Sequence, residues 1–214
     1  MILEKKEIIK LMTGGLIYAF SSSSLQASQI CNDHIVSSTP IKNFILYKSG
    51  VALDKSTGLM WKRCPNDMSW SEKDQKCSVI TDNNGKIYSE KNWKKALESV
   101  TKLNQNTGFA GYQDWRLPNL KELLTIIEKK CIDPAYSEAI FPNAYLGSTV
   151  TRYFWTSTPA GSNQVWVVSE DGGSIKKRDR DSGVNSPNGI IERVLLVRDA
   201  KDDTDKYIDG VQGN

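Results

Sequence analysis

Histidine occurs once among the 214 residues, as His34 in a polar N-terminal segment. Hydrolases of the Ser-His-Asp or Cys-His type need a histidine beside the nucleophile, and one isolated histidine gives little support to either arrangement. Also absent are the glycine-rich sequences that bind phosphate, Gly-x-x-x-x-Gly-Lys-[Ser/Thr] and Gly-x-Gly-x-x-Gly. The cysteines follow no Cys-x-x-Cys spacing, which disfavours a structural zinc site. We therefore expect no cofactor and no metal.

Paired carboxylates are the catalytic arrangement that remains open, because the two acids of a glycosidase can come from anywhere in a chain. Five acidic residues are available: Asp114, Glu122, Glu128, Asp133 and Glu170. Most have structural explanations, since Glu122 suits a helix cap, Asp133 precedes a proline in a turn, and Glu170 falls in a hairpin. We therefore predict that the chain is not an enzyme, and an envelope hydrolase with an unrecognised acid pair is the weakest of three hypotheses.

The N-terminus is typical of a secretory signal peptide. Three lysines in the first ten residues precede an apolar stretch over 11–20, followed by serines and Ala27. That stretch is too short to span a bilayer, which takes about 20 apolar residues. We expect cleavage after Ala27, export to the periplasm or the cell exterior, and no stable membrane insertion afterwards.

Charge is nearly balanced. The formal net charge is +3, and loss of residues 1–27 leaves 25 Lys and Arg against 23 Asp and Glu, or +2. That balance argues against a general nucleic-acid or membrane-surface binder, so we expect no nucleic acid among the partners.

After removal of the signal peptide, the chain is expected to form an extended arm over 28–42, one domain over 43–199 and a disordered acidic tail over 200–214.

The cysteines are even in number, which in an exported chain favours disulfides over free thiols. They are Cys31, Cys64, Cys77 and Cys131, and they allow three pairings. Cys64 and Cys77 flank a polar loop over 65–71 that has little to hold it by packing, so a bond between them would contribute about 3 kcal/mol. We favour Cys64–Cys77, which leaves Cys31 with Cys131.

Short apolar runs separated by turn residues predict strands over 43–47, 51–54 and 59–63. Later strands are predicted over 153–157, 164–169 and 173–177, and an apolar run over 190–197 predicts a last one. Asp171-Gly172-Gly173 is a strong signal for a tight hairpin between two of these later strands.

Two helices are predicted between the two groups of strands. Ser89 can cap the first, in which apolar residues recur at helical spacing from Trp93 to before Gly108. The second is expected from Leu120 to about Lys130, with Asn119 and Glu122 as the partners of a capping box. Strands, two helices and further strands indicate an α+β domain.

Several ordered motifs carry a family resemblance: Thr57-Gly58-Leu59-Met60-Trp61, Asp114-Trp115-Arg116-Leu117-Pro118-Asn119, Phe141-Pro142-Asn143, Trp155-Thr156-Ser157-Thr158, Trp166 and Val197-Arg198. Together they resemble the Lcl C-terminal domain family over roughly residues 43–199, a family of exported bacterial domains named from a collagen-like adhesin. The resemblance implies a C-type lectin-like fold, similar to that of formylglycine-generating enzymes, with helices packed on antiparallel sheets and long late loops. It also implies a polyanionic glycan as the first ligand to test, since that adhesin binds sulfated glycosaminoglycans. This chain has no collagen repeat.

The strongest concentration of charge is Lys-Lys-Arg-Asp-Arg over 176–180, after the hairpin and before a loop over 181–189. With no apolar partner between them, these cations are expected to keep their charged heads in water. They could bind a sulfated or carboxylated polysaccharide, or they could be a solvated loop partly neutralised by Asp179 and Asp181. The candidate ligand-binding residues are Lys176, Lys177, Arg178 and Arg180.

Tryptophan and arginine side chains leave further alternatives. Five tryptophans lie in periodic or strand contexts and are expected in the core: Trp61, Trp93, Trp115, Trp155 and Trp166. Trp70 lies in the polar loop, where it could stack on a sugar or anchor a partner, or be buried by a loop that folds back; it is kept as a candidate binding residue. Arg116 is expected to form a buried ion pair with Asp114 or Glu122, and Arg193 and Arg198 similar pairs.

Three functions are compatible with these patterns. The leading hypothesis is a secreted or surface-exposed, non-catalytic, adhesin-like binding domain that contacts an extracellular polyanionic glycan. The second is a protein-interaction subunit of an envelope or surface assembly, and the third is the hydrolase described above.

Overall fold

The computed structural model describes residues 29–81, 83, 92–142, 144, 152–182 and 191–200. The predicted signal peptide, the loop over 183–190 and the tail beyond Ala200 lie outside these residues. In chain order the elements are β1 (Ile30–Cys31), η1 (Ile41–Asn43), β2 (Phe44–Leu46), β3 (Val51–Asp54), β4 (Leu59–Lys62), β5 (Met68–Ser71), β6 (Lys76–Val79), α1 (Trp93–Gln105), α2 (Leu120–Leu124), β7 (Cys131–Ile132), β8 (Arg152–Pro159), β9 (Gln164–Ser169), β10 (Ile175–Asp179), β11 (Ile191–Arg193) and β12 (Val197–Asp199).

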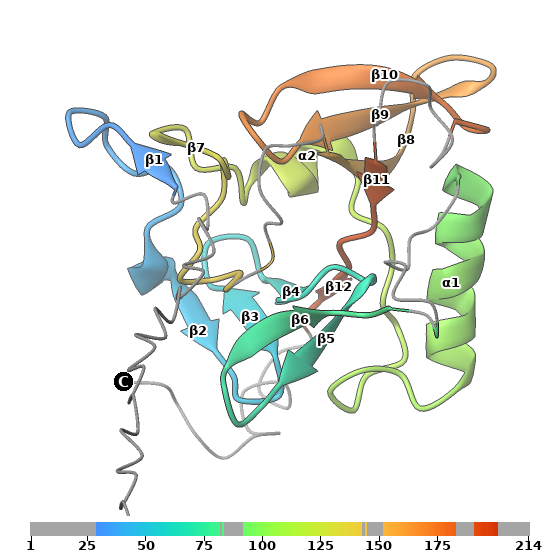
Figure 1. The fold of residues 1–214 in the computed structure, drawn as a ribbon, viewed down its shortest axis with the longest axis horizontal. Helices are drawn as coiled ribbons and strands as arrows, with labels where there is room; N and C mark the ends of the chain where they lie inside the picture. Colours follow the sequence, from blue (N-terminus) through green and yellow to red (C-terminus); the bar gives the residue numbers. More distant parts are fainter. Residues whose placement is uncertain are drawn as a thin grey trace, which may run out of the picture.

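The first sheet has the strand order β12-β4-β3-β2 and is antiparallel throughout (Figure 1). The predicted meander of β2, β3 and β4 is confirmed. Gly58 closes the β3–β4 turn at a φ of +71°, a left-handed conformation that glycine adopts without steric cost. Every residue of β3 and β4 is buried, because the domain covers both faces of this sheet.

The second sheet has the order β10-β9-β8-β11. Its β9–β10 hairpin is confirmed, with Gly173 at a φ of +69°. The expectation of purely antiparallel sheets is wrong, because β11 runs parallel to β8.

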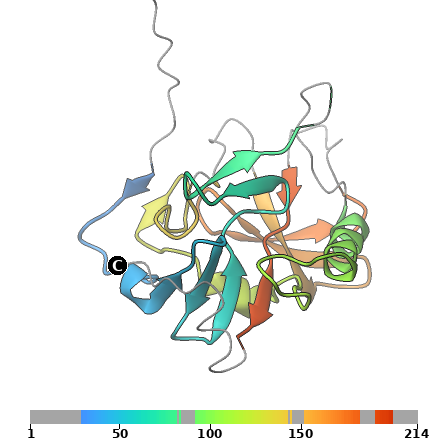
Figure 2. The ribbon, with the colours of Figure 1, turned by 90° about the horizontal axis from the view of Figure 1, so that it is seen from below.

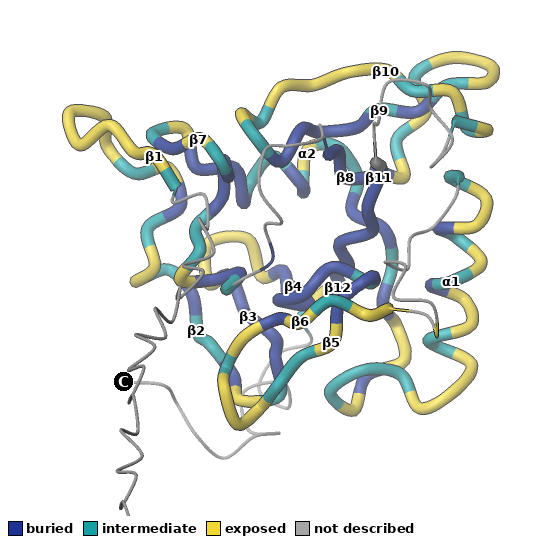
Figure 3. Tube along the Cα trace, viewed as in Figure 1, coloured by how far each residue is buried: buried dark blue, intermediate teal, exposed yellow. Residues whose placement is uncertain are grey.

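The apolar run over 190–197 is not one strand. Its ends belong to β11 and β12 in different sheets, and Val194, Leu195 and Leu196 between them are at most 1% exposed. In Figure 3 this connection is dark blue where it passes through the interior. A segment buried on all sides produces the same run of apolar residues as a buried strand, so the pattern could not separate the two.

The two helices differ from their predicted bounds. The cap of α1 is Asn92, whose side chain accepts the backbone N–H of Lys95, and Ser89 lies outside the described residues. The capping box of Asn119 and Glu122 opens α2 as predicted, but α2 ends at Leu124. It ends early because the following residues form turns, and Ile127 makes an isolated bridge to Tyr136.

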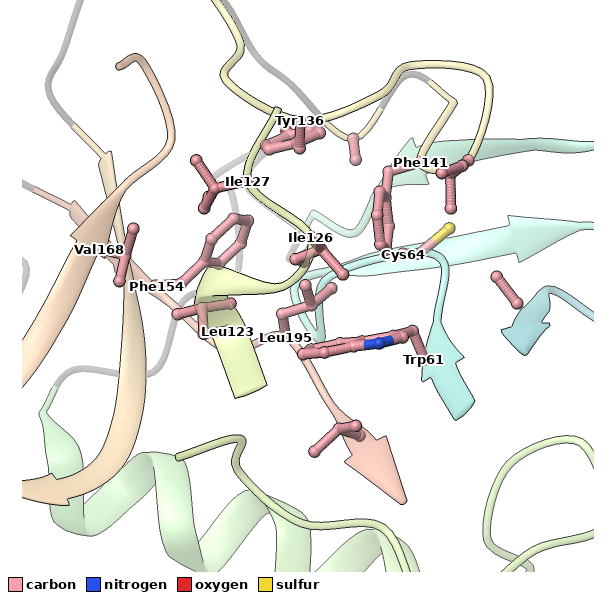
Figure 4. Packing of buried hydrophobic residues seen from close by; sticks show 14 of the residues in the cluster. Trp61, Cys64, Leu123, Ile126, Ile127, Tyr136, Phe141, Phe154, Val168 and Leu195 are labelled. Carbon is pink, nitrogen blue, oxygen red and sulfur yellow. The ribbon is translucent and has the colours of Figure 1, made fainter. Parts of the chain in front are cut away.

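The core consists of two clusters. Figure 4 shows the first, in which side chains of α2, the two sheets and the 136–141 segment converge around Trp61 and Leu195. The second lies beneath α1 and includes Trp115 and Trp155. Trp61, Trp115 and Trp155 are at most 2% exposed, which confirms their core role, whereas Trp93 and Trp166 are half-buried. Helix α1 and the N-terminal strand β1 lie at opposite ends of the domain (Figure 2).

Both disulfides favoured from the sequence are present, Cys64–Cys77 and Cys31–Cys131. The segment between Cys64 and Cys77 is not the loosely packed loop that we expected. It contains the hairpin of β5 and β6, in which Met68 is 3% exposed. Two disulfides favour an oxidising environment. Among the described residues, no helix is long and apolar enough to cross a membrane.

Candidate functional site

The four candidate cations lie on or next to β10, at one edge of the second sheet. Lys176, Lys177 and Arg178 belong to β10, and Arg180 follows it. Lys176 and Lys177 fall in the strand predicted over 173–177, and the strand continues through Arg178, because the tight turn after β9 brings Ile175–Asp179 into register with β9. Figure 3 shows β10 exposed over most of its length.

Side chains alternate across a strand, so β10 divides its cations between two faces of the sheet. Lys177 lies opposite Trp166, and its Nζ is 5.2 Å from the centre of the indole. Lys176 lies on the other face, opposite Val167. Both lysines are exposed, and a cation over an exposed indole gains roughly 0.5–1 kcal/mol. Lys177 and Trp166 therefore present a charge and a half-exposed ring together.

Arg178 and Arg180 are held by the domain. The Arg178 guanidinium lies 4.7 Å from the ring centre of Tyr153, and its Nε is 3.7 Å from Oε1 of Glu192. The Arg180 guanidinium lies 5.0 Å from the ring centre of Trp93. Both Nε atoms are buried. The expectation that all four heads stay in water is therefore wrong for these two, because aromatic rings of β8 and α1 cover them.

Glu192 reduces the charge that Arg178 can offer a ligand. The Glu192 side chain is 2% exposed, against 24% for Arg178. Burial raises the pKa of Glu192, while Arg178 and the hydroxyl of Ser182 act to lower it. The cationic surface of β10 therefore consists mainly of Lys176 and Lys177, with a contribution from Arg180.

Trp70 packs against the domain from β5. Its Nε1 donates a hydrogen bond of 2.7 Å to the carbonyl of Lys48, and the Arg63 guanidinium lies 4.5 Å from the ring centre. A Cβ added to Gly50 would lie 2.5 Å from the ring, so the indole rests directly on that backbone. The geometry favours the alternative in which this segment folds back, and a ligand could contact only the exposed remainder of the ring.

The Trp-Arg-Leu-Pro corner is held by ion pairs. Arg116 forms two hydrogen bonds to Glu122, of 2.8 and 2.9 Å, and a third of 2.9 Å to Asp199. Asp114 pairs instead with Arg198, at 2.7 Å. The expected pairing of Arg116 is thus confirmed for Glu122, but the pair is only partly buried, since the Arg116 side chain is 37% exposed. These charges join the corner to β12.

Arg193 forms the buried ion pair that we expected, but its two carboxylate partners were not predicted. Arg193 lies 2.9 Å from Asp67 and 3.0 Å from Glu170, and all three side chains are at most 3% exposed. Burial raises the pKa of Glu170 to about 7, against the opposing charge of Arg193 and with added repulsion from Asp67. The Tyr136 hydroxyl also bonds to Glu170.

Glu170 lies in the β9–β10 turn as expected, but the burial of its side chain against Arg193 was not predicted. The available signal was Arg193, which interrupts the apolar run over 190–197. An arginine buried within such a run needs carboxylate partners. The sequence could not show which carboxylates supply them.

Glu128 fastens the N-terminal arm, residues 28–42, to the domain. Its carboxylate accepts the backbone N–H groups of Ser38, Thr39 and Lys130 and the hydroxyls of Ser37, Ser38 and Thr39. Burial acts to raise the pKa of Glu128, but these hydrogen bonds outweigh burial and hold the pKa at about 2. This acid therefore has a structural role.

Other acids that could have formed a catalytic pair are also engaged. Asp114, Glu122 and Glu170 pair with arginines, as described above. Asp133 stands before Pro134 at a φ of +52°, in the expected turn. In the part of the chain that the structure describes, no group of three His, Cys, Asp or Glu side chains could hold a metal ion.

The family model of the Lcl C-terminal domain matches residues 50–186. The chain belongs to this family. No curated protein matches the chain. The Lcl C-terminal domain match includes the Trp-Arg-Leu-Pro corner, the β9–β10 hairpin and all four candidate cations. Val197-Arg198, one of the motifs that carried the resemblance, lies beyond it.

Proposed function

We propose that this Lcl C-terminal domain protein is an exported, non-catalytic, adhesin-like binding domain that recognises a polyanionic glycan along β10. The observation that carries the proposal is the exposed pair Lys176 and Lys177 on an edge strand, with Trp166 beside Lys177. A family named from an adhesin and two disulfides support a surface-exposed binding domain. We also propose that the α+β fold is of the C-type lectin-like type.

An edge strand suits an extended polymer. Among the strands that the structure describes, β10 pairs only with β9. At about 3.3 Å per residue, the backbone from Lys176 to Arg180 spans roughly 13 Å. An extended polymer with sulfates or carboxylates could contact Lys176 and Lys177 around the edge of the sheet and Arg180 farther along it. Such contacts give binding that weakens as salt screens the charges. The small net charge of the whole chain favours a local glycan site over nucleic acid or a membrane surface.

Edge lysines have a second physical role, because exposed charges on an edge strand prevent two sheets from joining. Retention on immobilised heparin in a salt gradient separates the two roles. The test variant replaces Lys176 and Lys177 with glutamine, and the control replaces Lys73 and Lys76, which are exposed on the β5–β6 hairpin and change the net charge equally. Glycan binding predicts that the test variant loses most retention while the control elutes close to the wild type. Identical elution of both variants, or no retention of the wild type at low salt, would refute it.

A protein partner is the second candidate, favoured by exposed apolar side chains at the N-terminal end. Ile30 is 59% exposed and Ile132 49% exposed, and they lie opposite each other in the β1–β7 pair. Val36 in the arm is 89% exposed. A partner that co-purifies with the wild type but not with Ile132→Asp would support this function. Turnover in a glycan-hydrolysis screen would support a hydrolase instead.

A further inference from the structure

A recess of about 250 Å³ lies where the N-terminal arm meets the first sheet and the end of α2. Its walls come from three segments that are far apart in the sequence: residues 38–44, the β3–β4 turn over 54–57, and residues 124–129. No residue of β10 lines it. The recess is therefore separate from the surface of the proposed function.

These walls are fixed by hydrogen bonds. Glu128 holds the arm through the contacts described above, and the Ser38 hydroxyl donates to the carbonyl of Ile127 at 3.0 Å. In the β3–β4 turn, Asp54 accepts the N–H of Ser56 and the hydroxyl of Thr57, each at 2.8 Å. A preformed pocket loses little conformational entropy when a ligand enters, so it can bind a small molecule with few contacts.

The lining is both apolar and rich in uncharged polar groups. Its apolar residues are Phe44, Leu124 and Ile127. Its uncharged polar residues are Ser38, Thr39, Asn43, Ser56, Thr57 and Thr125. Asp54 and Lys129 add one charge of each sign, so their formal charges cancel.

Three lining side chains are available to a ligand. Within the described residues, the side chains of Asn43, Ser56 and Lys129 have no hydrogen bond or ion pair. An amide, a hydroxyl and an ammonium together supply several donors and two kinds of acceptor. These groups stand around the same recess as the apolar lining.

We propose that this recess binds a neutral, polyhydroxylated ligand of monosaccharide size. The volume is below the 300–1,000 Å³ that is typical of sites for drug-sized ligands, so the occupant is small. A sugar has C–H surfaces that suit the apolar lining and hydroxyls that suit the Asn43 amide, the Ser56 hydroxyl and the Lys129 ammonium. Opposite charges in one recess give no net attraction for a simple anion or cation.

The test is a titration of the oxidised, ¹⁵N-labelled full chain with glucose, galactose, mannose and N-acetylglucosamine, followed by amide chemical shifts. Concentrations up to roughly 50 mM would saturate a site whose Kd is about 1 mM. We expect saturable shifts for at least one sugar, confined to the Asn43 side chain and the backbone of residues 54–57 and 124–129. The absence of saturable shifts for all four sugars would overturn the proposal.

Ser56→Trp tests the location, because the new side chain would fill the recess while the backbone N–H to Asp54 is kept. Ser162→Trp is the matched control, since Ser162 is exposed in the β8–β9 connection. We expect Ser56→Trp to weaken binding more than tenfold and Ser162→Trp to leave it unchanged. If Ser56→Trp does not fold, Asn43→Ala removes one polar group without adding volume and should weaken binding several-fold.

Two further outcomes would contradict the proposal. Sugar shifts that survive both recess variants would place the sugar elsewhere. Binding of glycine, a zwitterion, without binding of any sugar would show that the Asp54 and Lys129 charges select the ligand. The two proposals are tested separately, because β10 lines no part of the recess. A failure of the wild type to bind heparin would refute the β10 site without changing the outcome of the sugar titration.

Discussion

Replacing Glu128 with glutamine should loosen residues 37–39 of the N-terminal arm, which the Cys31–Cys131 disulfide still tethers, and destabilise the domain at neutral pH. Glutamine keeps the size of the side chain, but it loses the charge and places an amide donor where N–H and O–H groups now donate. The effect should be largest at Ser38 and Thr39, because their backbone N–H groups have this carboxylate as their acceptor.

The size of the expected loss of stability follows from the pKa of Glu128. Hydrogen bonds from the arm outweigh the opposing effect of burial and lower the pKa from 4.5 to about 2. That difference corresponds to roughly 3 kcal/mol of stability at neutral pH. Because the folded-state pKa is depressed, this stability is fully present above pH 4.5 and is lost as the pH falls towards 2. Glu128→Gln should therefore cost about 2–3 kcal/mol at pH 7 and progressively less below pH 4.5.

Urea unfolding followed by tryptophan fluorescence measures the free energy of unfolding, and repeating it at several pH values gives the pH dependence. The free energy of unfolding should be compared for wild type and Glu128→Gln at several pH values from 3 to 7. Glu72→Gln, at an exposed glutamate in the β5–β6 turn, is the control and should stay within about 0.5 kcal/mol of the wild type. A Glu128→Gln variant as stable as the wild type at pH 7, or a difference as large at pH 3 as at pH 7, would contradict the stabilising role of the Glu128 carboxylate.

Three further predictions concern stability. Cys64→Ser should cost about 2–5 kcal/mol, and non-reducing peptide mapping should recover Cys64 and Cys77 as one linked pair; free thiols at both positions would contradict this. Trp115→Ala should cost about 3–5 kcal/mol because the ring is buried, and an unchanged melting temperature would contradict its core role. The pKa of Glu170 is raised, so the folded state holds a proton that the unfolded state releases, and stability should fall as the pH rises from 4.5 to about 7. Glu170→Gln should remove that slope, and its persistence would assign the slope to other groups.

Features set by local chemistry could be predicted from the sequence. The capping box of Asn119 and Glu122 and the Asp171-Gly172-Gly173 hairpin each depend on residues a few positions apart. The Cys64–Cys77 bond closes a short segment, and the second bond followed by elimination. Strand bounds were accurate where turn residues flanked an apolar run, as in β3 and β9.

Features set by distant partners could not be predicted. Helix α2 ends early in a segment that is drawn into contacts with the arm and with Tyr136. The burial of Glu170 depends on Arg193 and Asp67, from opposite ends of the domain sequence. The same limit applies to the candidate site, where the cations were found by their density but the rings that cover Arg178 and Arg180 come from β8 and α1.

The salt dependence of binding to a heparin oligosaccharide tests the role of β10 most directly. Affinities should be measured at several salt concentrations for the wild type, for the Lys176→Gln, Lys177→Gln variant and for the Lys73→Gln, Lys76→Gln control. By analogy with nucleic acids, each cation that contacts the polymer contributes roughly 0.7–0.9 to the slope of log K against log salt. Glycan binding along β10 predicts a weaker affinity and a slope smaller by about 1–2 for the β10 variant alone. Equal affinity and slope for the wild type and the β10 variant would contradict it.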